Sequence, residues 1–276
     1  MNAPIDPCQT APLLAGPTSG PLLAVPTAGR LEPSACVDFA RDGMLLRRGY
    51  FSRAEMDALL SYARNDAPLQ QGARVMKDAA GRASRLNLWT TLSDDLYARF
   101  SRCRRVAGAA AQLLGEEVYH WHAKMMLKEP KIGGAWEWHQ DYGYWYQDKC
   151  LSPQLVSCMV AVDRATKANG CLQVLRGSHH FGRIDHGKFG DQVGADPVRV
   201  AAARVRCELV HFEAEPGDVI FFHGNLLHGS EANTSDHSRW SLIMTYNARS
   251  NSPLVSGGFH PDYSPLPILE DDLILG

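Results

Sequence analysis

The spacing of apolar residues changes near residue 115, and this change limits the folds open to the chain. Before it, two stretches, from Phe51 to about Arg64 and from Ser93 to Leu114, carry apolar residues at helical spacing. Beyond it, apolar and polar residues alternate, with Gly, Pro or Asn-Gly breaks at intervals of about 8 to 15 residues. The clearest predicted strands are Glu117–Lys128, Gln154–Val162, Cys171–Leu175, Cys207–Glu213, Asp218–His223 and Arg239–Asn247. We therefore expect a mainly helical part over 31–115 and β-sheets over 116–253.

Local signals support both halves. Ser52 and Glu55 have the spacing of a capping box, which predicts a helix start. Gly115 stands where the second helix, Ser93 to Leu114, would receive its C-terminal cap. Pro216 and Gly217 suit the central positions of a type II turn between two strands.

The chain, with 276 residues and 45% hydrophobic content, is long enough for one sizeable core. We expect a single domain over 31–276 that ends in a C-terminal extension at 254–276. The Pro-, Ala- and Gly-rich residues 1–30 are expected to form a disordered or surface-draped tail. A polar insertion at 178–206, which includes a short Ala-rich helix, is either a lid over an entrance or a passive surface excursion.

Charge and composition exclude several classes of partner. A net charge of -2 leaves no broad basic surface for nucleic acid. No apolar run approaches membrane-spanning length, and the N-terminus lacks the features of a secretory signal. The 7 cysteines are odd in number and show no Cys-x-x-Cys spacing, which favours reduced thiols in the cytoplasm. We expect a small-molecule substrate, with a monomer and a homodimer both open.

A His-x-Asp pair lies in the densest aromatic run of the sequence, Trp138 to Tyr146. In an extended strand His139 and Asp141 would project from one face, as two ligands of a metal ion. Such a pair is common by chance, so it needs support from elsewhere in the chain. The best third ligand is His228, and His223 is the competing candidate. Two imidazoles and one carboxylate suit a non-haem Fe(II) that must also bind a bidentate cosubstrate and oxygen.

An arginine strengthens this interpretation. Arg239 opens the last predicted strand, and alternation places it on the same face as Ser241. A guanidinium pairs bidentately with a carboxylate such as the far end of 2-oxoglutarate. A salt bridge from Arg239 to a structural acid is the alternative.

Five stretches in this order resemble the phytanoyl-CoA dioxygenase family of Fe(II)/2-oxoglutarate oxygenases, which includes ectoine hydroxylase. The stretches are His139-Gln140-Asp141, Asn169 through His179, Pro216-Gly217-Asp218, His228-Gly229-Ser230 and Arg239-Trp240. The resemblance covers about 117–253. One departure is Leu175-Arg176-Gly177, where members often have Pro before the Gly.

The resemblance implies a double-stranded β-helix, or jelly roll, with flanking helices. It also implies iron held by His139, Asp141 and His228, and 2-oxoglutarate anchored by Arg239, with O2 as the second cosubstrate. In related halogenases a small residue replaces the carboxylate ligand, so Asp141 favours hydroxylation, with succinate and CO2 as co-products. Desaturation or ring formation in natural-product biosynthesis would use the same chemistry.

The expected substrate is a small zwitterionic or amine-bearing molecule, because aromatic faces attract ammonium groups. The candidate contacts are Tyr142, Tyr144, Trp145 and Tyr146, of which either Tyr144 or Trp145 would lie on the inner side of a continued strand. Trp145 also stands where ectoine hydroxylase has a substrate-contacting tryptophan. An amino acid, a betaine-like compound and an aminophosphonate, on which similar bacterial members act, all fit. A zinc hydrolase has no need of Arg239, and a noncatalytic cupin-like module would usually have lost a ligand.

Overall fold

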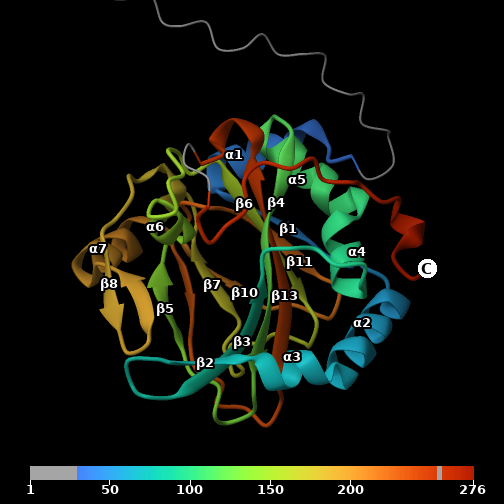
Figure 1. Ribbon diagram of the computed structural model, residues 1–276. Helices are drawn as coiled ribbons and strands as arrows, with labels where there is room; N and C mark the ends of the chain where they lie inside the picture. The colour runs from blue at the N-terminus through green and yellow to red at the C-terminus, as the bar shows by residue number, and fades with distance from the viewer. Residues whose placement is uncertain (1–29, 254–256) are drawn as a thin grey trace, which may run out of the picture.

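The structure is a computed structural model that describes residues 30–253 and 257–276. Its centre is a pair of antiparallel sheets that lie face to face (Figure 1). The larger sheet has seven strands in the order β1 (Met44–Arg47), β11 (Val219–His223), β6 (Leu155–Ala161), β13 (Arg239–Ala248), β4 (Val118–Lys128), β3 (Ala83–Trp89) and β2 (Arg74–Lys77). The smaller sheet has four, in the order β10 (Leu209–Phe212), β7 (Leu172–Leu175), β12 (His228–Ser230) and β5 (Trp136–His139). This is the expected double-stranded β-helix, mainly β with flanking helices.

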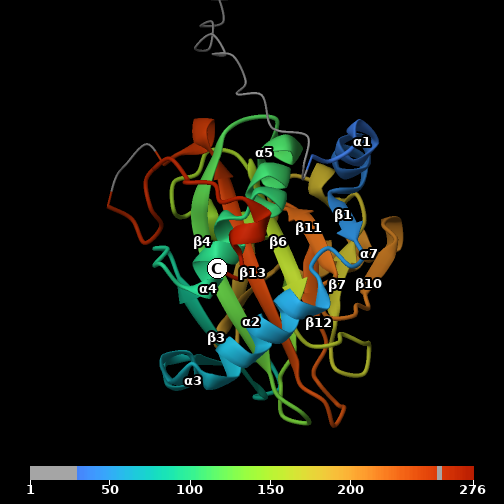
Figure 2. The ribbon, with the colours of Figure 1, turned by 90° about the vertical axis from the view of Figure 1, so that its right-hand side faces the viewer.

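Helices cover the outer face of the larger sheet. They are α1 (Pro33–Asp42), α2 (Arg53–Asn65), α3 (Ala67–Gly72), α4 (Leu96–Arg102), a π-helical turn (Arg104–Gly108) and α5 (Ala109–Leu114). Figure 2 shows α2, α4 and α5 in front of β4, β6 and β13. Short 3-10 turns occur at Ser178–His180, Arg249–Asn251 and Asp271–Leu273. The predicted capping box starts α2, where the Ser52 hydroxyl accepts from the Glu55 backbone N–H and the Glu55 carboxylate accepts from the Ser52 N–H.

Alternation along β13 divides the core into two layers. Trp240, Leu242, Met244 and Tyr246 face the helices in the larger cluster of buried apolar residues. Ile243 faces the smaller sheet and packs in a second cluster with side chains such as Met126, Met159 and Phe222. The predicted turn also forms, with Gly217 at φ 92° and the Asp218 N–H bonded to the Glu215 carbonyl. The inner face of β13 is therefore the face that carries Arg239 and Ser241.

Helices make up most of the secondary structure of 31–115, and strands that the sequence pattern did not predict accompany them. Three strands lie in this part: β1 pairs with β11, β3 pairs with β4, and β2 extends the sheet beyond β3. They supply partners to backbone groups of β11 and β4 that would otherwise form exposed sheet edges. The N-terminal part thus contributes strands to the larger sheet of the barrel.

The predicted helix from Ser93 to Leu114 is interrupted at Cys103. This residue is extended, with φ -64° and ψ 142°, and it forms an isolated bridge with Leu269. The Arg104 N–H donates to the Leu269 carbonyl instead of continuing α4. Pairing with the C-terminal segment therefore breaks the helix.

The 178–206 insertion folds against the strand that precedes the metal site. It contains β8 (His186–Phe189), β9 (Gln192–Ala195) and the predicted Ala-rich helix, α7 (Pro197–Arg206). The Gln192 side chain accepts from the Glu137 N–H and donates to the Ala135 carbonyl, which fixes β9 beside β5. The insertion is therefore a supporting wall of the barrel and not a passive excursion.

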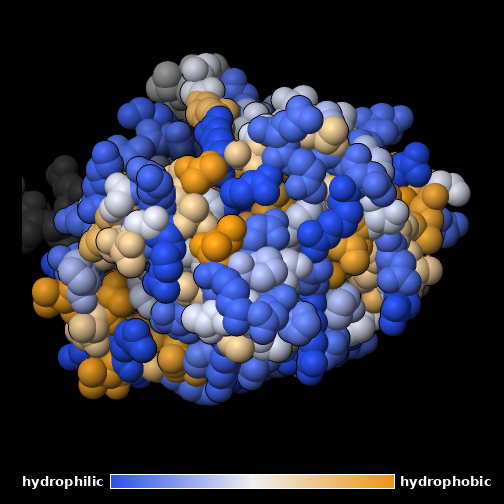
Figure 3. Space-filling view, turned by 90° about the horizontal axis from the view of Figure 1, so that it is seen from below, coloured by the Kyte–Doolittle hydropathy of each residue, from blue (hydrophilic) through white to orange (hydrophobic). Residues whose placement is uncertain are grey.

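Other features of the described residues concern surface and cysteines. The six cysteines outside the first 29 residues are free thiols. No helix in the described part of the chain is long and apolar enough to cross a membrane. The face seen in Figure 3 carries apolar residues in small groups among hydrophilic ones. The expected tail at 1–30 falls, apart from Arg30, outside the described residues.

Candidate active site

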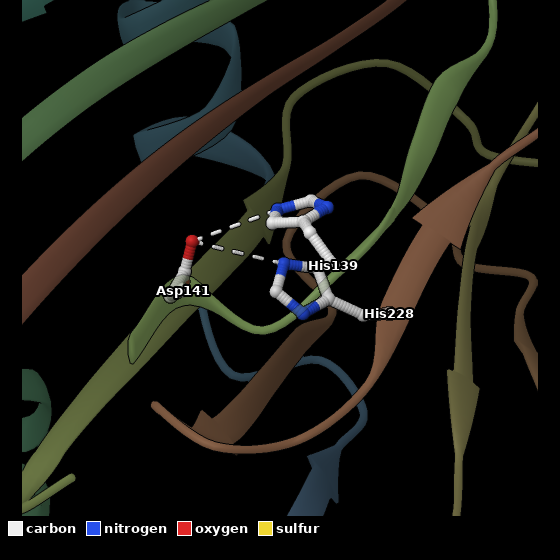
Figure 4. Close-up of side chains that lie close together, drawn as sticks. All are labelled: His139, Asp141 and His228. Carbon is white, nitrogen blue, oxygen red and sulfur yellow. Dashed lines mark ion pairs between the residues drawn. The ribbon is translucent and has the colours of Figure 1, made fainter. Parts of the chain in front are cut away.

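The three predicted metal ligands converge where β5 ends and β12 begins. His139 is the last residue of β5 and His228 the first of β12, and the two are opposite partners in that antiparallel ladder. Asp141 begins α6 (Asp141–Trp145), two residues beyond the end of β5. The Asp141 Oδ1 atom lies 3.6 Å from Nε2 of His139 and 3.9 Å from Nε2 of His228 (Figure 4). One ligand atom from each residue lies within 4.8 Å of the others, and all three side chains are buried.

Hydrogen bonds fix which imidazole nitrogen is free in each histidine. Nδ1 of His139 lies 2.7 Å from the Glu137 carbonyl, and Nδ1 of His228 lies 2.9 Å from the Leu226 carbonyl. A carbonyl only accepts, so both Nδ1 atoms carry the hydrogen and both Nε2 atoms present a lone pair. Two imidazoles and a carboxylate, aimed at one point, are the donor set of a non-haem Fe(II) site.

The charge states suit a cation. Burial, with a contribution from neighbouring His139, lowers the pKa of His228 to about 3. Burial alone would raise the pKa of Asp141, but Lys124 and the two histidines lower it, and the net direction is downward. The site therefore holds one carboxylate and a neutral His228 imidazole at neutral pH.

The structure corrects the reason for the convergence of His139 and Asp141. Gln140 is still extended, with φ -105° and ψ 130°, but α6 starts directly after it. The aromatic residues that follow are therefore helical, and the expectation that Tyr144 or Trp145 lies on the inner side of a strand was wrong. The short helix turns Tyr144 and Trp145 in different directions.

The four predicted substrate residues lie in different surroundings. The Tyr144 ring is 5.4 Å from the His139 ring, and its hydroxyl donates to the Val193 carbonyl. Trp145 is buried beside Trp121. Tyr142 is buried with its hydroxyl on the Cys150 carbonyl, whereas Tyr146 is 46% exposed below the Arg183 guanidinium. Of the four, Tyr144 is thus the one whose ring neighbours a residue of the metal group.

Gln140 holds the two ligand-bearing residues in place. Its side chain donates to the carbonyls of Asn225 and Gly182 and accepts from the Ile184 N–H at 2.7 Å. Its own backbone N–H donates to Nε2 of His186. The residue between the ligands is therefore tied both to the loop before β12 and to the 178–206 insertion.

A cavity joins the metal group to Arg239. Its lining includes His139, His228, Ser230, Lys124 and Arg239. The guanidinium of Arg239 donates to the Gly170 carbonyl at 2.7 Å and to the Ser241 hydroxyl at 3.2 Å, and its Nε atom is buried without a partner in the described residues. No carboxylate of the described chain pairs with it, so a structural salt bridge does not explain this arginine. Burial lowers the pKa of Arg239 to about 10.

Sequence reasoning missed two lysines, one in this cavity and one in its wall. Lys124 lines the cavity itself. Lys128 is buried and donates to the Ser230 hydroxyl at 2.8 Å, and Ser230 also contacts Arg239. Alternation along β4 could have found both lysines, because they share the inward face with Met126. His223, the competing third ligand, accepts from the Asn225 N–H and is not part of the metal group.

Comparisons with known proteins agree with this arrangement. The sequence profile described as phytanoyl-CoA dioxygenase (PhyH) matches residues 39–241. L-proline trans-4-hydroxylase of Streptomyces griseoviridis is 31% identical over 194 residues, which cover 64% of this chain and 70% of that protein. Ectoine dioxygenase of Bordetella parapertussis is 29% identical over 229 residues, covering 78% and 74%.

A solved structure is similar over most of its length. EctD from S. alaskensis with 2-oxoglutarate and 5-hydroxyectoine superposes with a TM-score of 0.71 at 25% identity, covering 87% of this chain and 88% of that chain. The chain therefore belongs to the phytanoyl-CoA dioxygenase (PhyH) family and is an Fe(II)/2-oxoglutarate-dependent dioxygenase, with O2 as the other cosubstrate.

Proposed function

We propose that this enzyme hydroxylates an unactivated C–H bond of a small zwitterionic or amine-bearing molecule, with succinate and CO2 as co-products. His139, Asp141 and His228 hold the iron. The iron, when bound with 2-oxoglutarate and oxygen, supplies the oxidising power that the side chains lack. The relatives named for L-proline and ectoine act on molecules of this kind, which supports the substrate class.

The observation that carries the proposal is the buried Arg239 without a carboxylate partner, in the same cavity as two metal-binding imidazoles. An unpaired buried cation is costly, so it indicates a missing anion. The far carboxylate of 2-oxoglutarate fits: it would accept from Arg239 while the Ser230 and Ser241 hydroxyls contact the guanidinium. Lys124, near the iron end, places a second positive charge along the same dicarboxylate.

The remaining cavity wall excludes water from the reacting groups. Met126, Met159, Leu172, Phe222 and Ile243 line it with apolar side chains. In such surroundings the charge-assisted contacts of Arg239 are stronger than they would be in water. This chain thus binds, orients and encloses the cosubstrate.

The experiment has two stages. Anaerobic addition of Fe(II) and then 2-oxoglutarate should give a charge-transfer absorbance, and its absence would refute the oxygenase assignment. Oxygen is then admitted in the presence of L-proline, ectoine, 2-aminoethylphosphonate or glycine betaine, and succinate is measured. Substrate-dependent succinate above the uncoupled background, with a product 16 mass units heavier in about equal amount, supports hydroxylation.

A further inference from the structure

A bulge in β4 brings two consecutive side chains to the same pair of aromatic neighbours. Thr245 of β13 pairs with His122, but the next residue, Tyr246, pairs with His120, so Trp121 is the extra residue. Bulges re-aim side chains, and they are frequent next to active sites. Here both Trp121 and His122 reach the same neighbours, Trp145 and His260.

These four residues form an aromatic box, a name used below for Trp121, His122, Trp145 and His260. Trp121 stacks on His260 with centroids 4.3 Å apart, and His122 lies 5.2 Å from His260 and 5.7 Å from Trp145. Trp121, His122 and Trp145 are each buried. An Asp148 carboxylate oxygen lies 3.6 Å from Nε2 of His260, which adds a negative charge at the edge.

A chain of hydrogen bonds connects the aromatic box to the metal group. The Ser157 hydroxyl donates to Oδ2 of Asp141, and it lies 2.8 Å from the Thr245 hydroxyl, which lies 3.3 Å from Nε2 of His122. A carboxylate only accepts, so the Ser157 hydroxyl donates its one hydrogen to Asp141. The Ser157 oxygen must then accept the hydrogen of the Thr245 hydroxyl. Thr245 in turn accepts from His122, so the hydrogen of this imidazole is on Nε2.

The opposite nitrogen of His122 is therefore a bare lone pair. Nδ1 of His122 is buried and has no hydrogen-bond partner among the described residues. Burial is the main reason that the pKa of His122 lies well below its usual value, so the ring is neutral. A buried acceptor left unpaired is costly, and it indicates a ligand that brings an N–H or O–H.

We propose that the aromatic box binds the protonated amine of the substrate, and that Nδ1 of His122 accepts one of its N–H hydrogens. This inference rests on the proposed function and narrows it to substrates with a primary or secondary ammonium group. The ring faces attract any cation, quaternary ones included. A primary or secondary ammonium can donate an N–H to the lone pair and a quaternary ammonium cannot, so a betaine-like compound is excluded as the preferred substrate.

The test compares matched amines. Binding is measured by titration calorimetry under nitrogen, on the full chain loaded with Mn(II) in place of Fe(II) and with 2-oxoglutarate. The probe pairs are L-proline with its N,N-dimethyl form, and 2-aminoethylphosphonate with its N,N,N-trimethyl form. At least one N–H-bearing probe should bind about 10-fold or more tightly than its methylated partner.

Two variants separate the lone pair from the shape of the pocket. His122→Phe keeps a ring without the acceptor, so the preference over the methylated partner should fall to about 2-fold or less. His122→Asn places an amide oxygen near the position of Nδ1, so it should restore much of the preference. Equal binding of both members of each pair to the wild type, no binding of any N–H-bearing probe, or a preference that survives in His122→Phe overturns the inference. The charge-transfer test of the proposed function needs no amine. Failure of the proposed function can therefore be distinguished from failure of the amine-binding inference.

Discussion

His139 and His228 face each other across the ladder between β5 and β12, with ring centroids 4.0 Å apart. The two Nε2 atoms and the Asp141 carboxylate point toward one position. A metal ion bound there by the folded chain should stabilise the fold. Anaerobic Fe(II) is expected to raise the Tm of the wild type by several degrees. Asp141→Ala should lose this rise and all turnover, whereas the exposed Asp185→Ala should keep both. A metal-dependent rise of wild-type size in Asp141→Ala would disprove the assignment.

Arg239 should control the affinity for 2-oxoglutarate. Losing a bidentate contact to a carboxylate costs about 2 to 3 kcal/mol, which is roughly 30- to 150-fold in Kd. Arg239→Ala should therefore shift the charge-transfer titration by this factor. Arg239→Lys keeps the charge but loses the planar guanidinium. Its Kd for 2-oxoglutarate should therefore lie between those of the wild type and Arg239→Ala. An Arg239→Ala protein with wild-type affinity for 2-oxoglutarate would show that another residue is the anchor.

Gln140 should influence the metal without touching it. Gln140→Ala leaves the Ile184 N–H and two carbonyls unpaired, which should lower the free energy of unfolding by about 1 to 3 kcal/mol. Looser support of the ligands should also weaken metal affinity about 10-fold. Urea unfolding and competitive metal titration measure the two effects. A stability loss with unchanged metal affinity would restrict Gln140 to a purely structural role.

His223 should make stability depend on pH. Burial is the main cause that lowers its pKa from 6.5 to about 4. Between these values the unfolded chain binds a proton that the folded protein does not, so stability is full above pH 6.5 and falls as the pH drops toward 4. Lowering the pH from 7 to 5 should cost roughly 2 kcal/mol through this residue alone.

The variant His223→Asn isolates that contribution. Asparagine can still accept from the Asn225 N–H, but it does not titrate. Its urea-unfolding free energy should therefore fall less between pH 7 and pH 5 than that of the wild type. Parallel pH curves for the two proteins would contradict the attribution to His223.

The capping box at Ser52 offers a test of local stability. Ser52→Ala removes the acceptor of the Glu55 N–H and should cost about 1 kcal/mol. Ser52→Asn keeps a side-chain oxygen at the N-cap and should recover most of it. Thermal unfolding measures both, and a Ser52→Ala protein with wild-type stability would show that the first turn of α2 contributes little.

What could be predicted from sequence was local. The faces of β13, the α2 cap and the Gly217 turn follow from short-range periodicity and backbone preference, and each is present. The pairing of β1 with β11 joins segments far apart in the chain. The sequence of neither strand indicates which strand it pairs with. The helix is interrupted at Cys103 because this residue forms a bridge with Leu269. The sequence close to Cys103 contains no signal of that distant contact.

The site also combines features that local sequence predicts with features that depend on distant strand pairing. Spacing brought His139, Asp141, His228 and Arg239 together as candidates, and the structure places them around one cavity and its metal group. The bulge that brings Trp121 to the same neighbours as His122 depends on register against β13, so alternation alone could not show it. Lys124 lay within reach of alternation, because it is two residues from Met126 on the inward face.

The bonds of Gln140 to Gly182, Ile184 and His186 have a consequence for altering this enzyme. The 178–206 segment is a candidate for exchange with the corresponding segment of a relative. A chimera must supply a carbonyl, an N–H and an imidazole at those three places, or the proposed iron ligands lose the support of Gln140. Replacement segments should therefore be selected for iron content before they are screened for activity.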